Sequence, residues 1–145
     1  MAILFNKEQN KYIELNLFRT NEPDWITYSI CGGNVLQQKR IELFRLDNDE
    51  LFFHNAVYEK EVENIIDGLT NIKELHRYKF EPVDEGEFRL ESNYKDNMVY
   101  MKFKFYIIDM IENEGIKDNI FEMETTYLIL LEFLTQLRKE YNIVK

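Results

Sequence analysis

The chain has 145 residues, and its 18 Lys and Arg residues against 27 Asp and Glu residues give a formal net charge of −9. This charge disfavours direct binding of DNA, RNA or an anionic membrane, because basic side chains supply most of the affinity for phosphates. One Cys and two His residues argue against a disulfide framework and a structural zinc site. A length near 150 predicts one domain over residues 1–145, and a hydrophobic fraction of 45% supplies enough apolar side chains for a core.

The first part of the chain carries the period of two that is typical of half-buried β-strands. Residues 12–18 alternate apolar and polar side chains, and residues 25–31 do so again. The Gly-Gly-Asn sequence at 32–34 predicts a tight turn, because these residue types tolerate a positive φ. We expect the return strand at 35–44 and a shorter extended piece at 51–54.

After residue 56 the hydrophobic period changes to three and four, which predicts a helix. Gly68 lies inside this pattern, and glycine costs a helix roughly 1 kcal/mol relative to alanine, so a straight continuation is less well supported there. The apolar face of this central helix comprises Tyr58, Val62, Ile65, Ile66, Leu69 and Ile72.

The period of two returns after residue 87. Phe88 and Leu90 share one face of a strand, and residues 99–107 form the clearest strand, with Tyr100, Lys102, Lys104 and Tyr106 on its wetter face. We expect a turn at 113–115, a short strand at 120–124, and a terminal helix capped by Thr125 or Thr126. The predicted fold class is α+β: a mostly antiparallel sheet of five to seven strands with a central helix and a C-terminal helix.

Sequence patterns for catalysis and metal binding are missing. Cys31 lies in a predicted apolar strand, where a cysteine is usually a small core residue. His54 and His76 are 22 positions apart and lack metal-ligand spacing. The sequence contains no Gly-x-Ser-x-Gly element, phosphate loop or dinucleotide fingerprint. We predict a protein that is not an enzyme and has no catalytic residues, cofactor or metal; an enzyme with an unrecognised carboxylate site stays an alternative.

The acidic excess is present in each third of the chain, and we expect it to lie on the folded surface. Such a surface can bind a basic protein, since charge complementarity raises association rates and selects partners. Ordinary solvation of loops and a helix face is the alternative for each acidic patch. The candidate partner-binding residues are Glu59, Glu63, Asp84, Glu85, Glu87, Glu91, Glu112 and Glu114. Candidate aromatic anchors are Trp25, Tyr94, Tyr100 and Tyr106, of which Trp25 could equally belong to the core.

The order of several short elements resembles the WapI-like immunity proteins of bacterial polymorphic-toxin systems. The resemblance spans roughly residues 12–141, and the Phe-Glu-Pro element and the Trp after an acidic residue are its most specific parts. The elements that carry it are Asp24-Trp25-Ile26, Leu51-Phe52-Phe53, Phe80-Glu81-Pro82, Phe88-Arg89-Leu90, Phe103-Lys104-Phe105 and Leu131-Glu132-Phe133-Leu134.

The resemblance implies a non-enzymatic cytoplasmic protein that binds and neutralises a cognate C-terminal toxin domain, an RNA-cleaving nuclease, by covering its basic surface. It supplies no catalytic motif and no binding residues. The N-terminal sequence has no basic region followed by a long apolar stretch, which also leads us to expect the cytoplasm. The alternatives are an acidic polyanion-mimic inhibitor of another nucleic-acid enzyme, of a phage-encoded type, and an interaction domain of another kind.

Overall fold

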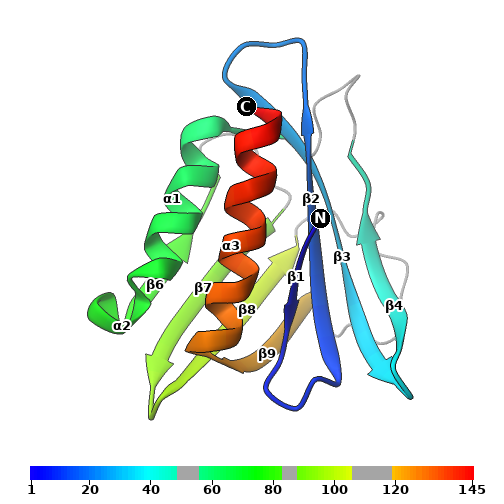
Figure 1. Ribbon diagram of the computed structural model, residues 1–145, viewed down its shortest axis with the longest axis vertical. Helices are drawn as coiled ribbons and strands as arrows, with labels where there is room; N and C mark the ends of the chain where they lie inside the picture. Colours follow the sequence, from blue (N-terminus) through cyan, green and yellow to red (C-terminus); the bar gives the residue numbers. More distant parts are fainter. Residues whose placement is uncertain (49–55, 83–87, 106–118) are drawn as a thin grey trace.

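The structure is a computed structural model that describes residues 1–48, 56–82, 88–105 and 119–145. These residues form two antiparallel sheets and three helices (Figure 1). The first sheet contains β1 (Ala2–Phe5), β2 (Lys11–Arg19), β3 (Trp25–Leu36), β4 (Lys39–Leu46) and β5 (Ala56–Tyr58). The second sheet contains β6 (Arg77–Phe80), β7 (Phe88–Lys95), β8 (Met98–Phe105) and β9 (Ile120–Thr126). The helices are α1 (Glu59–Thr70), α2 (Ile72–Leu75) and α3 (Tyr127–Val144).

The strands follow one another in space almost as they do in sequence. The first sheet has the order β1-β2-β3-β4, with β5 paired to the beginning of β3, and the second has the order β6-β7-β8-β9. The sheets meet at β9: the Lys7 amide donates a hydrogen bond to the Glu124 carbonyl at 2.9 Å, and the Thr125 hydroxyl donates to the Phe5 carbonyl at 2.8 Å. The predicted α+β class is confirmed, with more strands than expected.

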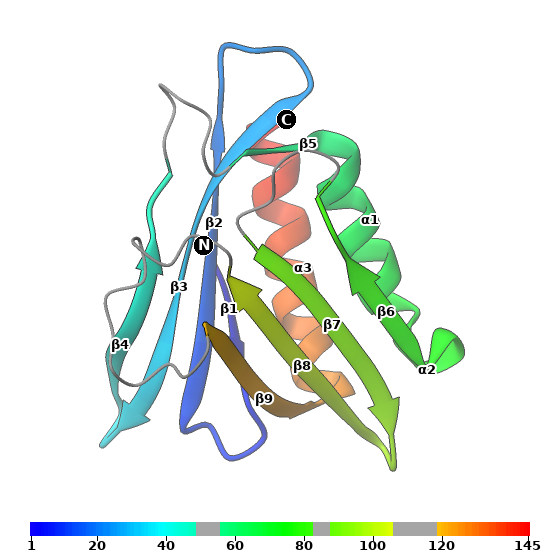
Figure 2. The same cartoon turned by 180° about the vertical axis from the view of Figure 1, so that it is seen from behind.

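Helices α1 and α3 lie over one face of the second sheet, and Figure 2 shows the other face of that sheet in front of them. The apolar stripe of α3 packs inward, and Leu130, Leu134 and Leu137 on it are all buried. As predicted, Thr126 caps the helix, its side chain accepting a hydrogen bond from the Ile129 amide at 3.2 Å. No helix within the described ranges has the length and apolar character to cross a membrane.

Two side chains of α3 form hydrogen bonds with backbone amides of the first sheet. Gln136 accepts a hydrogen bond from the Ile3 amide of β1 at 2.9 Å, and Glu140 accepts one from the Leu17 amide of β2 at 2.7 Å. Unpaired amides on an edge strand are templates for aggregation. These two bonds therefore occupy backbone donors of β1 and β2 while fixing the position of α3.

The expected turn at 32–34 is wrong, because β3 continues through Gly32 and Gly33 to Leu36. Neither glycine has a positive φ; the chain instead reverses at Gln37 and Gln38, with φ angles of 51° and 64°. The pairing of β3 with β4 shifts between Gly32 and Gly33, as in a β-bulge. Glycine is required at these positions because neighbouring strands approach closely, and not because of turn geometry. Since the chain reverses later than expected, the return strand begins at Lys39 instead of Val35.

Helix α1 continues through Gly68 but ends at Thr70, and Ile72, which the sequence placed on the same helix face, begins α2. A Cβ atom at Gly68 would lie only 2.1 Å from Cε1 of Tyr78. The Tyr78 hydroxyl donates a hydrogen bond to Asn64 Oδ1 at 2.6 Å, which holds its ring beside the helix. The absence of a side chain at Gly68 thus lets β6 approach α1 closely. This packing offsets the lower helix propensity of glycine.

Candidate functional site

The outer face of the second sheet, on the side away from α1 and α3, is the candidate functional site (Figure 2). The alternation of β8 explains its polarity: Val99, Met101 and Phe103 are buried, while Tyr100 and Lys104 are exposed and Lys102 is half-buried. This arrangement confirms the wet face expected for that strand. The charged residues of the four strands are the bases Arg77, Lys79, Arg89, Lys95, Lys102 and Lys104 and the acids Glu91, Glu122 and Glu124.

Strand register places these side chains in rows across the sheet. The first row alternates in charge and comprises Lys79, Glu91, Lys102 and Glu122. The second row comprises Arg77, Asn93, Tyr100 and Glu124. Opposite charges directly across a strand pair contribute roughly 0.2–1 kcal/mol each. The rows therefore support the sheet and also fix the charge pattern that the outer face presents to solvent.

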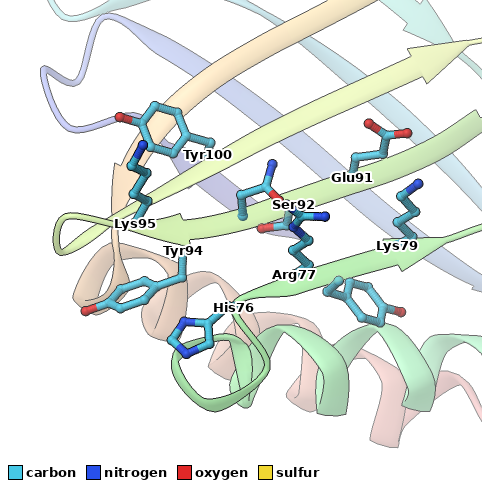
Figure 3. A pocket seen from close by; sticks show the side chains of 10 residues that line it. His76, Arg77, Lys79, Glu91, Ser92, Tyr94, Lys95 and Tyr100 are labelled. Atoms are coloured by element: carbon cyan, nitrogen blue, oxygen red, sulfur yellow. The ribbon is translucent and has the colours of Figure 1, made fainter.

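Two adjoining depressions lie over this face. The first, of about 570 Å³, extends to His76 and Tyr94 at the end of the sheet near α2, and Figure 3 shows it from close by. The second, of about 470 Å³, extends over β9 to Glu122 and Glu124. Both are lined by Glu91, Asn93 and Tyr100. These shared residues make the outer face one continuous polar surface instead of two separate sites.

Tyr100 stands in the middle of this surface, with 41% of its side chain exposed. The negative charge of Glu124, its cross-strand neighbour, raises the pKa of the Tyr100 hydroxyl, and a hydrogen bond to that carboxylate adds to the effect. The hydroxyl therefore keeps its proton at neutral pH and acts as a hydrogen-bond donor toward Glu124. Of the proposed aromatic anchors, Tyr94 and Trp25 are only partly exposed, and Tyr106 lies outside the described residues.

Trp25 is half-buried at the start of β3, where its ring lies against that of Tyr58, with centroids 4.0 Å apart and planes tilted by 37°. Tyr58 directly precedes α1 and pairs with Trp25 across β3 and β5. The tryptophan thus joins the first sheet to the start of the helical layer. It lies away from the outer face of the second sheet.

The three predicted partner-binding residues that the structure describes do not lie on one surface. Glu91 lies on the outer face of the second sheet, whereas Glu59 and Glu63 lie on α1, in the helical layer. The Glu63 carboxylate accepts a hydrogen bond from the Tyr141 hydroxyl of α3 at 2.7 Å, so it also has a structural role. The other five candidates lie outside the described residues: Asp84, Glu85, Glu87, Glu112 and Glu114.

The described residues are nearly neutral, with 18 acidic and 17 basic side chains. Of the 27 acids in the sequence, nine fall in residues 49–55, 83–87 and 106–118, which together contain a single base. The expectation of an acidic folded surface therefore does not hold for the described part of the chain. Its outer sheet face carries twice as many bases as acids.

The basic residues of β6 were not predicted as part of a functional site. Arg77 and Lys79 belong to β6, a strand of only four residues that was not predicted. The available signal was the short alternation Arg-Tyr-Lys-Phe at 77–80, in which both basic side chains fall on one face.

Cys31 is a buried residue of β3, as its apolar setting predicted. Burial and the nearby Glu14 carboxylate raise the pKa of its thiol to about 12. The thiolate is the reactive form of cysteine, so this side chain is unsuited to nucleophilic catalysis in the folded protein. Among the described residues, no group of three or more His, Cys, Asp or Glu side chains is placed to hold a metal ion.

The raised pKa predicts slow labelling of Cys31 in the native protein. At pH 8 a thiol reagent is expected to react about 10³-fold or more slowly with the folded chain than with the chain in denaturant, because the thiolate fraction is smaller. The absorbance of the released thiol product measures both rates. The denatured sample is the control, and stoichiometric labelling of the native protein within seconds would contradict the prediction.

Comparison of the chain with models of protein families, with curated proteins and with solved structures finds no match.

Proposed function

We propose that the chain is an immunity protein that binds a cognate toxin domain, an RNA-cleaving nuclease, in the cytoplasm and blocks its activity. The observation that carries the proposal is the outer face of the second sheet: a continuous polar surface with an exposed tyrosine at its centre. The resemblance of the element order to the WapI-like immunity proteins supports the choice of partner.

The shape of the outer face favours a protein partner over a small molecule. Small-molecule sites are concave and largely apolar, and they bury most of the ligand. Here the two depressions adjoin over one exposed sheet face, and most of the residues that line them are of polar or charged types. Protein interfaces, by contrast, combine a central aromatic residue with a polar rim, an arrangement that Tyr100 and the charged residues around it provide.

Neutralisation requires only that the bound protein cover the surface with which the toxin holds RNA. The immunity protein then needs no catalytic group of its own. Specificity for one toxin comes from charges placed to match that partner and to repel others.

Co-expression with the toxin domain encoded directly upstream tests the proposal. We expect the two proteins to co-purify in equimolar amounts and the complex to lose its RNA-cleaving activity, which a gel of labelled RNA measures. A toxin domain from an unrelated system is the control and should stay active. Absence of binding to the neighbouring toxin at micromolar concentrations, or a chromosomal position with no such gene, would refute the proposal.

A further inference from the structure

The outer face of the second sheet has opposite charges on its two outermost strands. β6 contributes the basic band, defined as Arg77 and Lys79, and β9 contributes the acidic band, defined as Glu122 and Glu124. All four side chains are exposed. Neighbouring strands are about 4.8 Å apart, so the two bands are roughly 14 Å apart across the four-stranded sheet. That separation exceeds the Debye length of about 8 Å at physiological ionic strength, so the two bands are screened from each other. Between them, Glu91 pairs with Lys79 and Lys102 pairs with Glu122.

The register aligns the two bands residue by residue. Arg77 lies in the same cross-strand row as Glu124, and Lys79 lies in the same row as Glu122. Tyr100 occupies the row of Arg77 and Glu124, between the bands. In Figure 3, Arg77 and Lys79 project from β6 on the side of the depression, beside Glu91 on the neighbouring strand. Each band is thus a pair of like charges presented to the same surface.

We infer that the toxin surface covered by this face is bipolar: it presents acidic side chains to the basic band and basic side chains to the acidic band. A uniformly basic surface would be repelled by the bases of the outer face, and like charges brought together at an interface cost several kcal/mol. The inference rests on the proposed function. It differs from the expectation based on net charge alone, which was a toxin surface that is basic throughout.

Two charge-reversed variants test the inference. The first, Arg77→Glu with Lys79→Glu, makes the basic band acidic; the second, Glu122→Lys with Glu124→Lys, makes the acidic band basic. Association with the toxin domain encoded upstream is followed by stopped-flow fluorescence at low and high salt. Each variant is expected to associate about tenfold or more slowly than wild type at low salt, with a smaller difference at high salt, because charge steering is screened.

The first variant distinguishes the two kinds of partner surface. A uniformly basic toxin would bind it faster than wild type, and that result would overturn the inference while leaving the proposed function intact. The matched control is Arg138→Glu with Lys139→Glu, which reverses two exposed bases on α3. Equal slowing in this control would also overturn the inference, since the effect would then come from net charge alone. If the wild-type protein does not bind the toxin domain, it is the proposed function that fails.

A second copy of the chain is the competing occupant of the outer face. A two-fold axis parallel to the strands would place the basic band of one copy opposite the acidic band of the other. Sedimentation velocity of the wild-type protein alone separates the cases. A single monomeric species at micromolar concentrations is the expected result. A dimer that dissociates in either charge-reversed variant would overturn the inference in favour of self-association. Thermal unfolding of every variant checks that the fold is kept.

Discussion

Replacing Phe44 by alanine is expected to lower the free energy of unfolding by about 3–5 kcal/mol, the usual cost of truncating a buried phenylalanine. Phe44 belongs to β4 of the first sheet and is only 1% exposed. Its ring centroid lies 4.7 Å from that of Phe105 on β8 and 5.3 Å from that of Phe121 on β9. The side chain therefore joins the two sheets, and the cavity left by alanine would open at their junction.

Urea unfolding followed by circular dichroism measures this loss, and the thermal midpoint should fall by roughly 10 °C. The matched control is Ile41→Ala on the same strand, where the side chain is 43% exposed and the expected change is within about 0.5 kcal/mol. Phe44→Leu keeps most of the volume and should cost only about 1 kcal/mol. If Phe44→Ala is as stable as Ile41→Ala, the two sheets do not pack through this ring.

The sequence predicted the long elements well because their patterns repeat. Residues 12–18 lie within β2, the central helix follows the apolar spacing from Val62 to Leu69, and the terminal helix begins at its threonine cap. The shortest strands, β1, β5 and β6, were missed because three or four residues cannot display a period of two against the background. The expected turn at 113–115 and the extended piece at 51–54 lie outside the described residues.

The candidate site was harder to predict, because its pattern arises from pairing between strands. Lys102 and Lys104 were placed on a wet face by the alternation of β8. That Glu91 would lie between Lys79 and Lys102 depends on the register of β6, β7 and β8, which no local spacing contains. The choice of acidic candidates followed net charge, and net charge does not say which face carries which residues.

Gly33 is a second case in which a contact between strands could not be predicted from the local sequence. Two adjacent glycines between strands are typical of a tight turn, which is why a turn is expected at 32–34. A close approach of backbones opposite a bulge, here at Leu43 of β4, uses the same residue type for another reason. A Cβ atom at Gly33 would lie 2.0 Å from the Ile41 carbonyl oxygen and 2.8 Å from the Leu43 amide nitrogen.

Gly33→Ala is therefore expected to destabilise the protein by about 3 kcal/mol or more, at the upper end of the cost of overpacking, because the obstructing atoms are backbone and cannot rotate away. The pairing of β3 with β4 would have to open at the bulge. Urea unfolding measures the loss, and the control is Gln38→Gly in the same hairpin, where φ is 64° and glycine relieves backbone strain. That control should be at least as stable as wild type. A fully stable Gly33→Ala would mean that β4 lies farther from β3 than the bulged pairing places it.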